Sequence, residues 1–246
     1  MNMPAISVSG LSVRFGDVHV LRNLSFEVGR GSIFGFLGPN GAGKSTTLKT
    51  LSGLIKPDAG EVVVDGISVI NHPVAVKKKI GVMLEDPALF PLMTIQEHFE
   101  MVGLIYGIDK HEVGVRVSRL LDFLHLENDA GKVVEKLSYG TKKKVSLGMA
   151  LIHNPDIFLL DEPFEGLDPE STFNLKDVFN HLKSIGKTVL ISSHLLELIE
   201  PIIDSVAVIE HGSVIYKSDQ VTEVSLREIY FKSVSMNEGR GLEWLR

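Results

Sequence analysis

Short runs in which apolar and polar residues alternate dominate the first part of the chain. Alternation at residues 6–8 and 11–15 is followed by similar runs at 18–21 and 24–28, with glycines between them. Because neighbouring side chains of a strand point to opposite faces, this pattern predicts strands with one buried face. We expect an antiparallel sheet, which precedes an apolar run at 33–37 that is typical of a buried parallel strand.

Beyond residue 37, apolar runs typical of strands alternate with segments of helical spacing. The further predicted strands occupy residues 61–66, 80–84, 156–160, 188–192, 206–209 and 214–216. The predicted helices among them occupy residues 44–54 and 170–184 and a segment that begins at residue 195. Strands that alternate with helices predict an α/β fold, in which helices cover both faces of a mostly parallel sheet.

Residues 86–154 differ from the rest, because helical spacing continues there without an intervening strand pattern. Three helices are expected, at 95–106 with Thr94 as the N-cap, at 113–124 and at 142–152. We interpret 86–154 as a helical subdomain inserted into a single domain. The expected division of residues 1–246 is a core with its antiparallel β subdomain at 1–85 and 155–220, the inserted subdomain, and a tail at 221–246.

Composition narrows the class of protein. Hydrophobic residues make up 44% of the chain and charged residues 23%, as in ordinary globular proteins. The net charge is −6 and no large basic tract is present, so we expect no nucleic-acid partner. Cysteine is absent, which excludes disulfide bonds and clusters held by the chain's own thiolates.

The sequence predicts neither a membrane span nor a secretory signal. The longest apolar stretch, residues 101–108, contains glycines and is far shorter than the ~20 residues that cross a bilayer. The first residues have neither the basic nor the apolar region of a signal peptide. We therefore expect a cytoplasmic protein.

Residues 38–46 match the phosphate-binding pattern G-x-x-x-x-G-K-[ST] without a mismatch. The members of this phosphate loop are Gly38, Pro39, Asn40, Gly41, Ala42, Gly43, Lys44, Ser45 and Thr46. We expect positive φ at the three glycines, which would bring backbone N–H groups against phosphate oxygens. Lys44 is expected to reach the β- and γ-phosphates, and the Ser45 hydroxyl to bind Mg²⁺. The sequence thus predicts a site for a nucleoside triphosphate.

Two acids follow the buried run at 156–160, where a parallel strand would deliver them at its carboxyl end. There Asp161 would hold Mg²⁺ through water, and Glu162 would act as the general base on the attacking water. Capping of the next helix by both acids is the alternative. Phe15 likewise fits either a core aromatic or a platform on which an adenine ring stacks.

The order of five motifs resembles the ATP-binding cassette of ABC transporters. These motifs are residues 38–46, 137–141, 160–163, 166–168 and His194. The signature run at 137–141, Leu-Ser-Tyr-Gly-Thr, is the most specific of them, because generic P-loop kinases and GTPases lack it. The resemblance covers nearly the whole chain, from Leu11 to about Tyr230, and implies an ATPase that uses ATP and Mg²⁺.

In that family two cassettes enclose two ATP molecules head to tail, so the resemblance implies further roles. Ser138 and the Gly140 amide would contact the γ-phosphate bound across the interface. His194 would contact the γ-phosphate as the switch histidine, and Asp168 would bridge the two subunits. Phe15 matches the aromatic residue that stacks on adenine. The basic run at 142–144 would either neighbour the triphosphate, which offsets its unfavourable position at a helix start, or form a solvated face.

Two departures from the family pattern affect the expected site. Tyr139 and Thr141 replace a glycine and the glutamine of the usual L-S-G-G-Q run. Glu85 stands where the family has a glutamine that senses Mg²⁺ and couples the helical subdomain to the membrane partner. A carboxylate there still offers Mg²⁺ a ligand but adds negative charge beside the phosphates. Both departures and the run at 225–231 look like the cassettes of drug, polysaccharide and antibiotic exporters.

The sequence therefore predicts an ATP-hydrolysing subunit that powers export through a separate membrane permease. It would lie on the inner face of the cell membrane, paired with a second copy of itself or with another cassette. A cassette ATPase without a transport role, such as that of iron–sulfur cluster assembly, is the alternative. The tail at 235–246, with Trp244, fits a partner contact and a packed terminal helix equally well.

Overall fold

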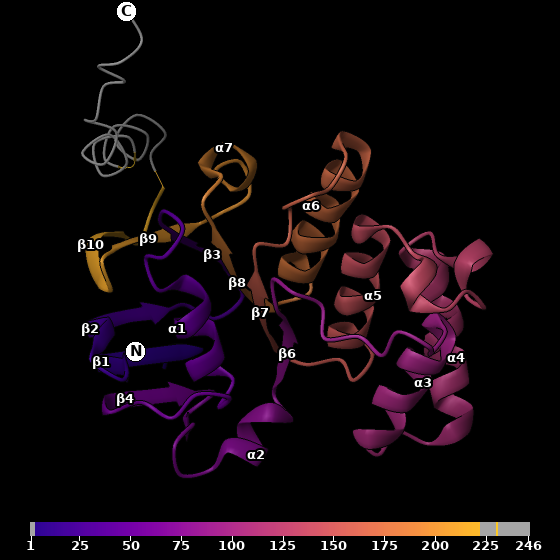
Figure 1. Cartoon of the computed structure of the whole chain (residues 1–246), viewed down its shortest axis with the longest axis horizontal. Coiled ribbons are helices and arrows are strands. Elements are labelled where there is room, and N and C mark those ends of the chain that lie inside the picture. Colours follow the sequence, from indigo (N-terminus) through magenta and orange to yellow (C-terminus); the bar gives the residue numbers. More distant parts are fainter. Residues whose placement is uncertain (1–2, 222–229, 231–246) are drawn as a thin grey trace, which may run out of the picture.

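The computed structural model describes residues 3–221 and residue 230. Two sheets lie side by side, and most of the helices stand beyond the larger sheet, on the side away from the smaller one (Figure 1). The predicted tail at 235–246 lies outside the described residues, as does the run at 225–231 apart from Tyr230. No helix among the described residues is both long and apolar enough to span a membrane.

The smaller sheet has the strand order β2-β1-β4-β5 and is antiparallel, as predicted. Its strands are β1 (Ile6–Phe15), β2 (Val18–Val28), β4 (Ala59–Val64) and β5 (Ile67–Ser68). The prediction of four short strands before residue 33 is wrong, because two long strands replace them. The irregular positions are accommodated by register shifts along β1, including one between Val8 and Leu11, so the strand bends instead of ending.

The larger sheet has the strand order β10-β9-β3-β8-β7-β6 and is parallel except for its β9–β10 edge pair. Its strands are β3 (Ile33–Leu37), β6 (Ile80–Met83), β7 (Ile157–Asp161), β8 (Thr188–Ser193), β9 (Ser205–Glu210) and β10 (Ser213–Ser218). Every residue of β3, β7 and β8 is buried. Their apolar residues, with polar ones only at the strand ends, therefore fit strands that are covered on both faces.

The α-helices are α1 (Lys44–Leu51), α2 (Pro73–Lys77), α3 (Ile95–Ile105), α4 (Lys110–Phe123), α5 (Tyr139–Leu151), α6 (Pro169–Ser184) and α7 (Leu196–Ile199). Short 3₁₀ turns, η1 (Glu127–Asp129) and η2 (Val134–Lys136), connect α4 to α5. The first helix is shorter than predicted, because Gly53 is left-handed with φ of 68° and ends it. The fifth begins before the predicted residue 142, because Ser138 caps it.

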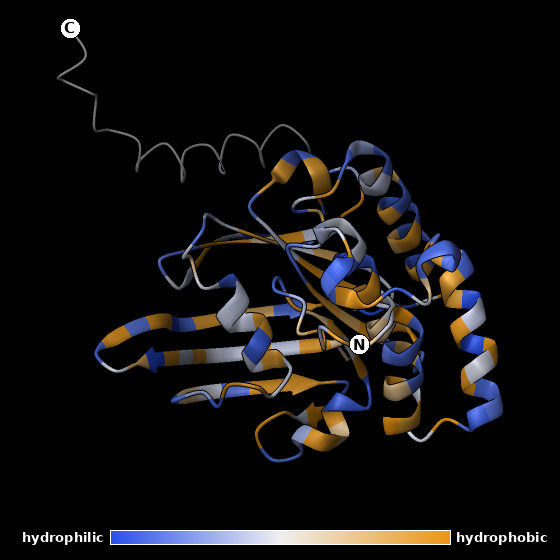
Figure 2. Cartoon of the chain, turned by 45° about the vertical axis from the view of Figure 1, so that its right-hand side comes forward, coloured by the Kyte–Doolittle hydropathy of each residue, from blue (hydrophilic) through white to orange (hydrophobic). Residues whose placement is uncertain are grey.

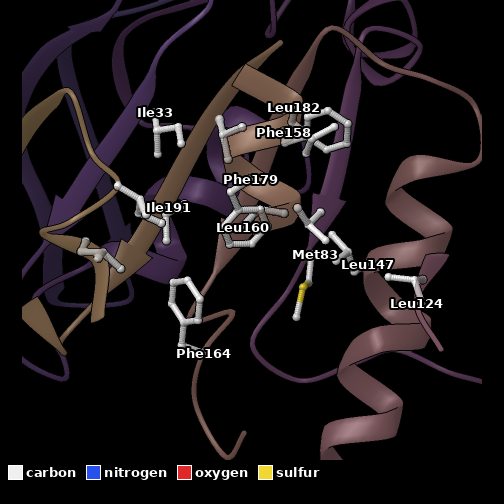
Figure 3. Packing of buried hydrophobic residues seen from close by; sticks show 14 of the residues in the cluster. Ile33, Met83, Leu124, Leu147, Phe158, Leu160, Phe164, Phe179, Leu182 and Ile191 are labelled. Atoms are coloured by element: carbon white, nitrogen blue, oxygen red, sulfur yellow. The ribbon is translucent and has the colours of Figure 1, made fainter. Parts of the chain in front are cut away.

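Two apolar clusters hold the layers together. One lies between the sheets, where the Phe26 ring stacks on Phe34 and Phe36 at centroid distances of 5.6 and 5.1 Å. The other joins the larger sheet to the helices, and Figure 3 shows Met83 between the sheet and Leu147 of α5. The helices have apolar residues on one side and polar residues on the other (Figure 2), as amphipathic helices require.

Candidate nucleotide-binding site

The functional groups predicted from the sequence follow neighbouring strands of the larger sheet. Strands β3, β8, β7 and β6 lie next to one another and run parallel, so their carboxyl ends share one edge. The phosphate loop follows β3 and His194 follows β8. Asp161 ends β7, and Glu85 lies just beyond β6. Ligands of open α/β sheets bind at this edge.

The phosphate loop requires glycine for two different reasons. Gly41 and Gly43 have φ values of 80° and 107°, in the left-handed region that other residues rarely adopt. Gly38 is not left-handed, so the prediction of a positive φ there is wrong. A Cβ atom at Gly38 would lie 2.3 Å from the backbone oxygen of Ile209, and glycine is needed because the loop approaches β9 closely.

The remaining loop residues are fixed by backbone bonds. The N–H of Ala42 donates to the carbonyl oxygen of Pro39 at 3.2 Å, and the Ala42 carbonyl accepts a bond from Gly212 at 3.0 Å. The Thr46 carbonyl accepts from a hydroxyl within α1. Asn40 is exposed. The loop is therefore anchored to β9–β10 on one side and open to solvent on the other.

Lys44 opens α1 and is only 6% exposed. Its ammonium donates to the carbonyl oxygens of Gly38 at 2.8 Å and Pro39 at 3.2 Å. It also lies 3.2 Å from Oε1 of Glu162. A buried ammonium at the N-terminus of a helix, bordered by oxygen atoms, is a ready partner for a phosphate group.

Glu162 directly follows β7 and is 4% exposed, with a φ of 46°. Such a left-handed value is strained for a residue with a side chain, and strain of this kind concentrates at functional sites. The backbone N–H of Glu162 donates to the Ser192 carbonyl at 3.2 Å. Nδ1 of His194 lies 3.0 Å from Oε1, the oxygen that also contacts Lys44. The structure thus gathers three of the predicted catalytic residues around one carboxylate oxygen.

Oxygen atoms suited to Mg²⁺ lie beside the phosphate loop. One oxygen of Asp161 accepts a bond from the Ser192 hydroxyl, and the other, Oδ2, has no hydrogen-bond partner in the described part of the chain. The Ser45 hydroxyl lies 3.4 Å from the Glu85 carboxylate. Magnesium prefers such ligands together with phosphate oxygens. The described residues contain no group of three or more His, Cys, Asp or Glu that could hold a metal, so the nucleotide would have to complete the site.

The signature run lies at the start of α5, with Ser138 as the N-cap. The Ser138 hydroxyl oxygen accepts a bond from the N–H of Thr141 at 3.2 Å, and Gly140 occupies the first turn. No hydrogen bond within residues 3–221 joins Ser138 or Gly140 to the phosphate loop. The structure therefore does not bring the signature residues onto Lys44 within one chain.

Lys143 is a site residue that the sequence interpretation did not identify. It is 1% exposed, and its ammonium donates to the backbone carbonyl of Glu162. The solvated-face interpretation of the basic run is therefore wrong for Lys143. The overlooked signal is helical periodicity, because Leu147 and Ala150 follow on the same buried face of α5.

The remaining residues of interest are Asp168, Phe15 and Tyr230. Asp168 caps α6, and a bond from the Ser171 N–H at 2.8 Å holds the pKa of Asp168 below its ordinary value. Phe15 is 53% exposed at the end of β1, so the core interpretation of this aromatic is wrong. Tyr230 donates from its hydroxyl to the backbone oxygen of His194, a contact that no sequence pattern indicated.

A phosphate loop between a buried strand and a helix, with an acidic pair on a nearby parallel strand, defines a P-loop nucleotide-binding protein. Residues 21–165 match the sequence family described as ABC transporter, which is more than half of the chain. Family membership therefore follows from sequence as well as from fold.

Individual relatives agree with this assignment. The chain is 37% identical over 209 residues to the Nod factor export ATP-binding protein I of Ralstonia nicotianae, a match covering 85% of this chain and 65% of that protein. It is 36% identical over 217 residues to the ABC transporter ATP-binding protein NatA of Bacillus subtilis, with coverages of 86% and 88%. The chain thus spans somewhat less than two thirds of the first relative and most of the second.

Solved structures give the same result. An ATP-binding subunit of an ABC transporter superposes with a TM-score of 0.85 and 30% identity, covering 94% of this chain and 99% of that one. A dimeric ATP-binding cassette in a post-hydrolysis state, bound to ADP and Pi, superposes with a TM-score of 0.81 and 25% identity, covering 88% and 100%. The chain belongs to the ABC transporter family and is an ATP-binding ATPase subunit of that family.

Proposed function

We propose that this subunit hydrolyses ATP with Glu162 as the general base and thereby powers export through a separate membrane permease. The observation that carries the chemistry is the placement of Glu162. Its buried carboxylate lies within 3.2 Å of Lys44 and 3.0 Å of His194, at the sheet edge that carries the phosphate loop. A general base needs such a fixed position beside the reacting phosphate.

The contacts of Lys44 and His194 suggest how the base is released. In the described arrangement both side chains contact Oε1 of Glu162. Phosphate oxygens would compete for the Lys44 ammonium and for the His194 ring. Glu162 would then be free to orient and deprotonate the attacking water, while Lys44 and His194 stabilise the charge on the γ-phosphate.

Magnesium fits the unpaired oxygen of Asp161, together with Ser45 and Glu85. When bound, Mg²⁺ would neutralise charge on the phosphate oxygens. Ser45 supplies a hydroxyl from the phosphate loop. Asp161 is oriented for this role because the Ser192 hydroxyl engages its other oxygen.

The signature residues imply a second cassette. Ser138 and Gly140 lie at the N-terminus of α5, where backbone N–H groups favour an anion, yet they make no hydrogen bond to the phosphate loop of the same chain within residues 3–221. In a head-to-tail dimer they would contact the γ-phosphate held by the partner, with Asp168 between the subunits and Phe15 against adenine. Either a second copy or a different cassette fits this arrangement.

A permease fits the apolar groove between the larger sheet and the helical segment, which consists of α3, α4 and α5. This coupling groove has a volume of about 400 Å³, and its lining includes Leu54, Ile105, Tyr106 and Met149. Ile105 is 73% exposed and Leu54 is 56% exposed, as expected for a surface that a cytoplasmic helix of the permease would cover. The export-related name of one relative supports the direction of transport. The subunit would then lie peripherally on the cytoplasmic face of the membrane.

The substitution Glu162→Gln tests the proposed chemistry. It keeps the size of the side chain and removes its basicity, so we expect ATP binding to persist while kcat falls by about 10²- to 10⁴-fold. Glu61→Gln is the matched control, because Glu61 is exposed on β4 outside the site. Hydrolysis by Glu162→Gln at the rate of the Glu61→Gln control would disprove the general-base role.

A further inference from the structure

The buried lysine of the signature helix is the most unusual charged group outside the roles assigned so far. Lys143 is 1% exposed, and its ammonium donates to the backbone carbonyl of Glu162. Burial lowers the pKa of Lys143, while the carboxylates of Glu165 and Glu162 oppose that change. A buried ammonium is costly unless it is paired and hydrogen-bonded, so its contact with the Glu162 peptide needs a reason.

The Glu162 peptide is the part of the site that requires support. With a φ of 46° it holds a conformation that a residue with a side chain leaves unless its surroundings maintain it. Its N–H donates to the Ser192 carbonyl at 3.2 Å. Its carbonyl accepts from Lys143 and from the N–H of Glu165 at 3.2 Å. Lys143 is the one of these partners that comes from the helical segment rather than from β8 or the Glu162 turn.

Tyr139, which occupies the glycine position of the usual signature run, lies against Lys143. The Lys143 ammonium lies 5.3 Å from the centroid of the Tyr139 ring, within the range of a cation–π contact. The Tyr139 hydroxyl donates to the backbone carbonyl of Glu85 at 3.3 Å. A Cβ atom at Gly166 would lie 2.7 Å from the Tyr139 ring, so the ring fits against a position that only glycine leaves free.

We propose that Lys143 is a positioning residue for hydrolysis, which fixes the peptide of Glu162 and thereby the direction of its carboxylate. Tyr139 confines the ammonium and ties the same helix turn to the backbone of Glu85. The first turn of α5 thus acts on the Glu162 peptide of its own chain, in addition to the contact across the dimer that Ser138 and Gly140 would make. The inference rests on the proposed general-base role of Glu162.

The substitution Lys143→Met removes the charge and the donor while keeping a long, flexible side chain. We expect kcat for ATP hydrolysis to fall by about 10- to 100-fold, because a misdirected base loses the reacting geometry. The dissociation constant of a fluorescent ATP analogue should stay unchanged, because Lys143 does not contact the phosphate loop. Lys136→Met is the matched control, since Lys136 is exposed before the same helix.

A conservative variant distinguishes the loss of the Lys143 charge and donor from a general folding defect. Lys143→Arg keeps the charge and the donor, and a cavity of about 530 Å³ that Lys143 lines offers room for the guanidinium. We expect Lys143→Arg to recover most of the activity that Lys143→Met loses. Equal losses in both variants, with equal midpoints of urea unfolding, would overturn the proposal.

A double-mutant cycle separates this inference from the function on which it rests. If Lys143 acts through Glu162, adding Lys143→Met to Glu162→Gln should cost no further activity. An additive loss in the double variant, or wild-type hydrolysis by Lys143→Met alone, would show that Lys143 does not position the base. Full activity of the single variant Glu162→Gln would instead show that Glu162 is not the general base, which is a failure of the proposed function.

Discussion

At the scale of single residues, one carboxylate oxygen contacts two of the other proposed catalytic side chains. Oε1 of Glu162 lies 3.2 Å from the Lys44 ammonium and 3.0 Å from Nδ1 of His194, and the acid is almost fully buried. Water is largely absent from such a place, so the interactions among these groups are stronger than they would be at the surface. We expect a triphosphate that enters the loop to change the partners of all three side chains at once.

Glu85 is the residue whose replacement should change the metal requirement. Its carboxylate lies 3.4 Å from the Ser45 hydroxyl, at the proposed Mg²⁺ position. We expect Glu85→Gln to raise the Mg²⁺ concentration for half-maximal hydrolysis by about tenfold, because a neutral amide is a weaker ligand than a carboxylate. Measuring the ATPase rate against Mg²⁺ at saturating ATP checks this.

The same substitution should act in the opposite direction on ATP without metal. Removing a negative charge beside the phosphates should tighten the binding of ATP in the presence of EDTA. Glu61→Gln serves as the control, because Glu61 is exposed on β4 outside the site. An unchanged Mg²⁺ requirement in Glu85→Gln would show that this carboxylate is not a ligand.

The sequence alone could identify the residues whose role follows from their neighbours in the chain. It could not identify those whose role depends on a partner distant in sequence. Lys44 and Ser45 belong to a contiguous motif, and Glu162 follows an apolar run, so local patterns are sufficient to identify each of them. The need for glycine at Gly38 depends on Ile209, a residue distant in sequence, and the role of Lys143 depends on a backbone atom of Glu162. Such partners are fixed only when the sheet assembles.

At the scale of single elements, the first residue of a helix could be predicted where its capping residues form a recognisable motif. Thr94 caps α3 in a capping box, because its hydroxyl oxygen accepts from the Glu97 N–H at 3.2 Å while the Glu97 carboxylate accepts from the Thr94 N–H at 2.7 Å. The predicted start of this helix is confirmed. The predicted start of α5 is too late, because the tyrosine and glycine after Ser138 hide a helical first turn.

Substitution of Thr94 by alanine should destabilise the fold by about 1 kcal/mol, because the N-terminal amides of α3 lose their hydroxyl partner. Urea unfolding at neutral pH checks this, and Thr172→Ala is the control, since Thr172 lies within α6 rather than at a cap. Equal free energies of unfolding for the wild type and Thr94→Ala would contradict the contribution of the cap.

The stabilising effect of this cap should also depend on pH. Bonds from the backbone N–H and then the hydroxyl of Thr94 hold the pKa of Glu97 below its ordinary value of 4.5. A lowered pKa in the folded state stabilises the protein above the ordinary value and loses its effect as the pH falls through the folded value. Alanine at position 94 keeps the backbone N–H and loses only the hydroxyl bond to Glu97. The share of the stability difference between the wild type and Thr94→Ala that comes from this hydroxyl bond should therefore shrink in acid.

At the scale of the whole molecule, the sheet edge and the coupling groove are connected through the helical segment. The Tyr139 hydroxyl at the start of α5 contacts the backbone of Glu85. The other end of the same helix supplies Met149 to the groove, where the Tyr106 ring stacks on His153 at 3.8 Å. A helix is a stiff element, so motion at the nucleotide site is expected to reach the groove.

The alternation of strands and helices was sufficient to predict the α/β core, because strands buried on both faces carry unbroken apolar runs. The order of the six strands was not predictable in the same way. It depends on which buried faces match, as in the packing of Met83 against the helices, and no local pattern records that choice (Figure 3).

The groove gives the prediction that separates a transporter subunit from a cassette ATPase without a transport role. We expect the tagged chain, purified in mild detergent from membranes of its native host, to carry a polytopic membrane protein in about equal amount. Ile105→Asp should abolish this association, because it places a charge on the apolar face that the permease helix would cover. Ile215→Asp is the control, since Ile215 is an exposed apolar residue on β10, away from the groove. If only soluble partners were recovered and the wild-type chain were missing from the membrane fraction, the role in export would be contradicted. The assignment of the chain as an ATPase would not be affected.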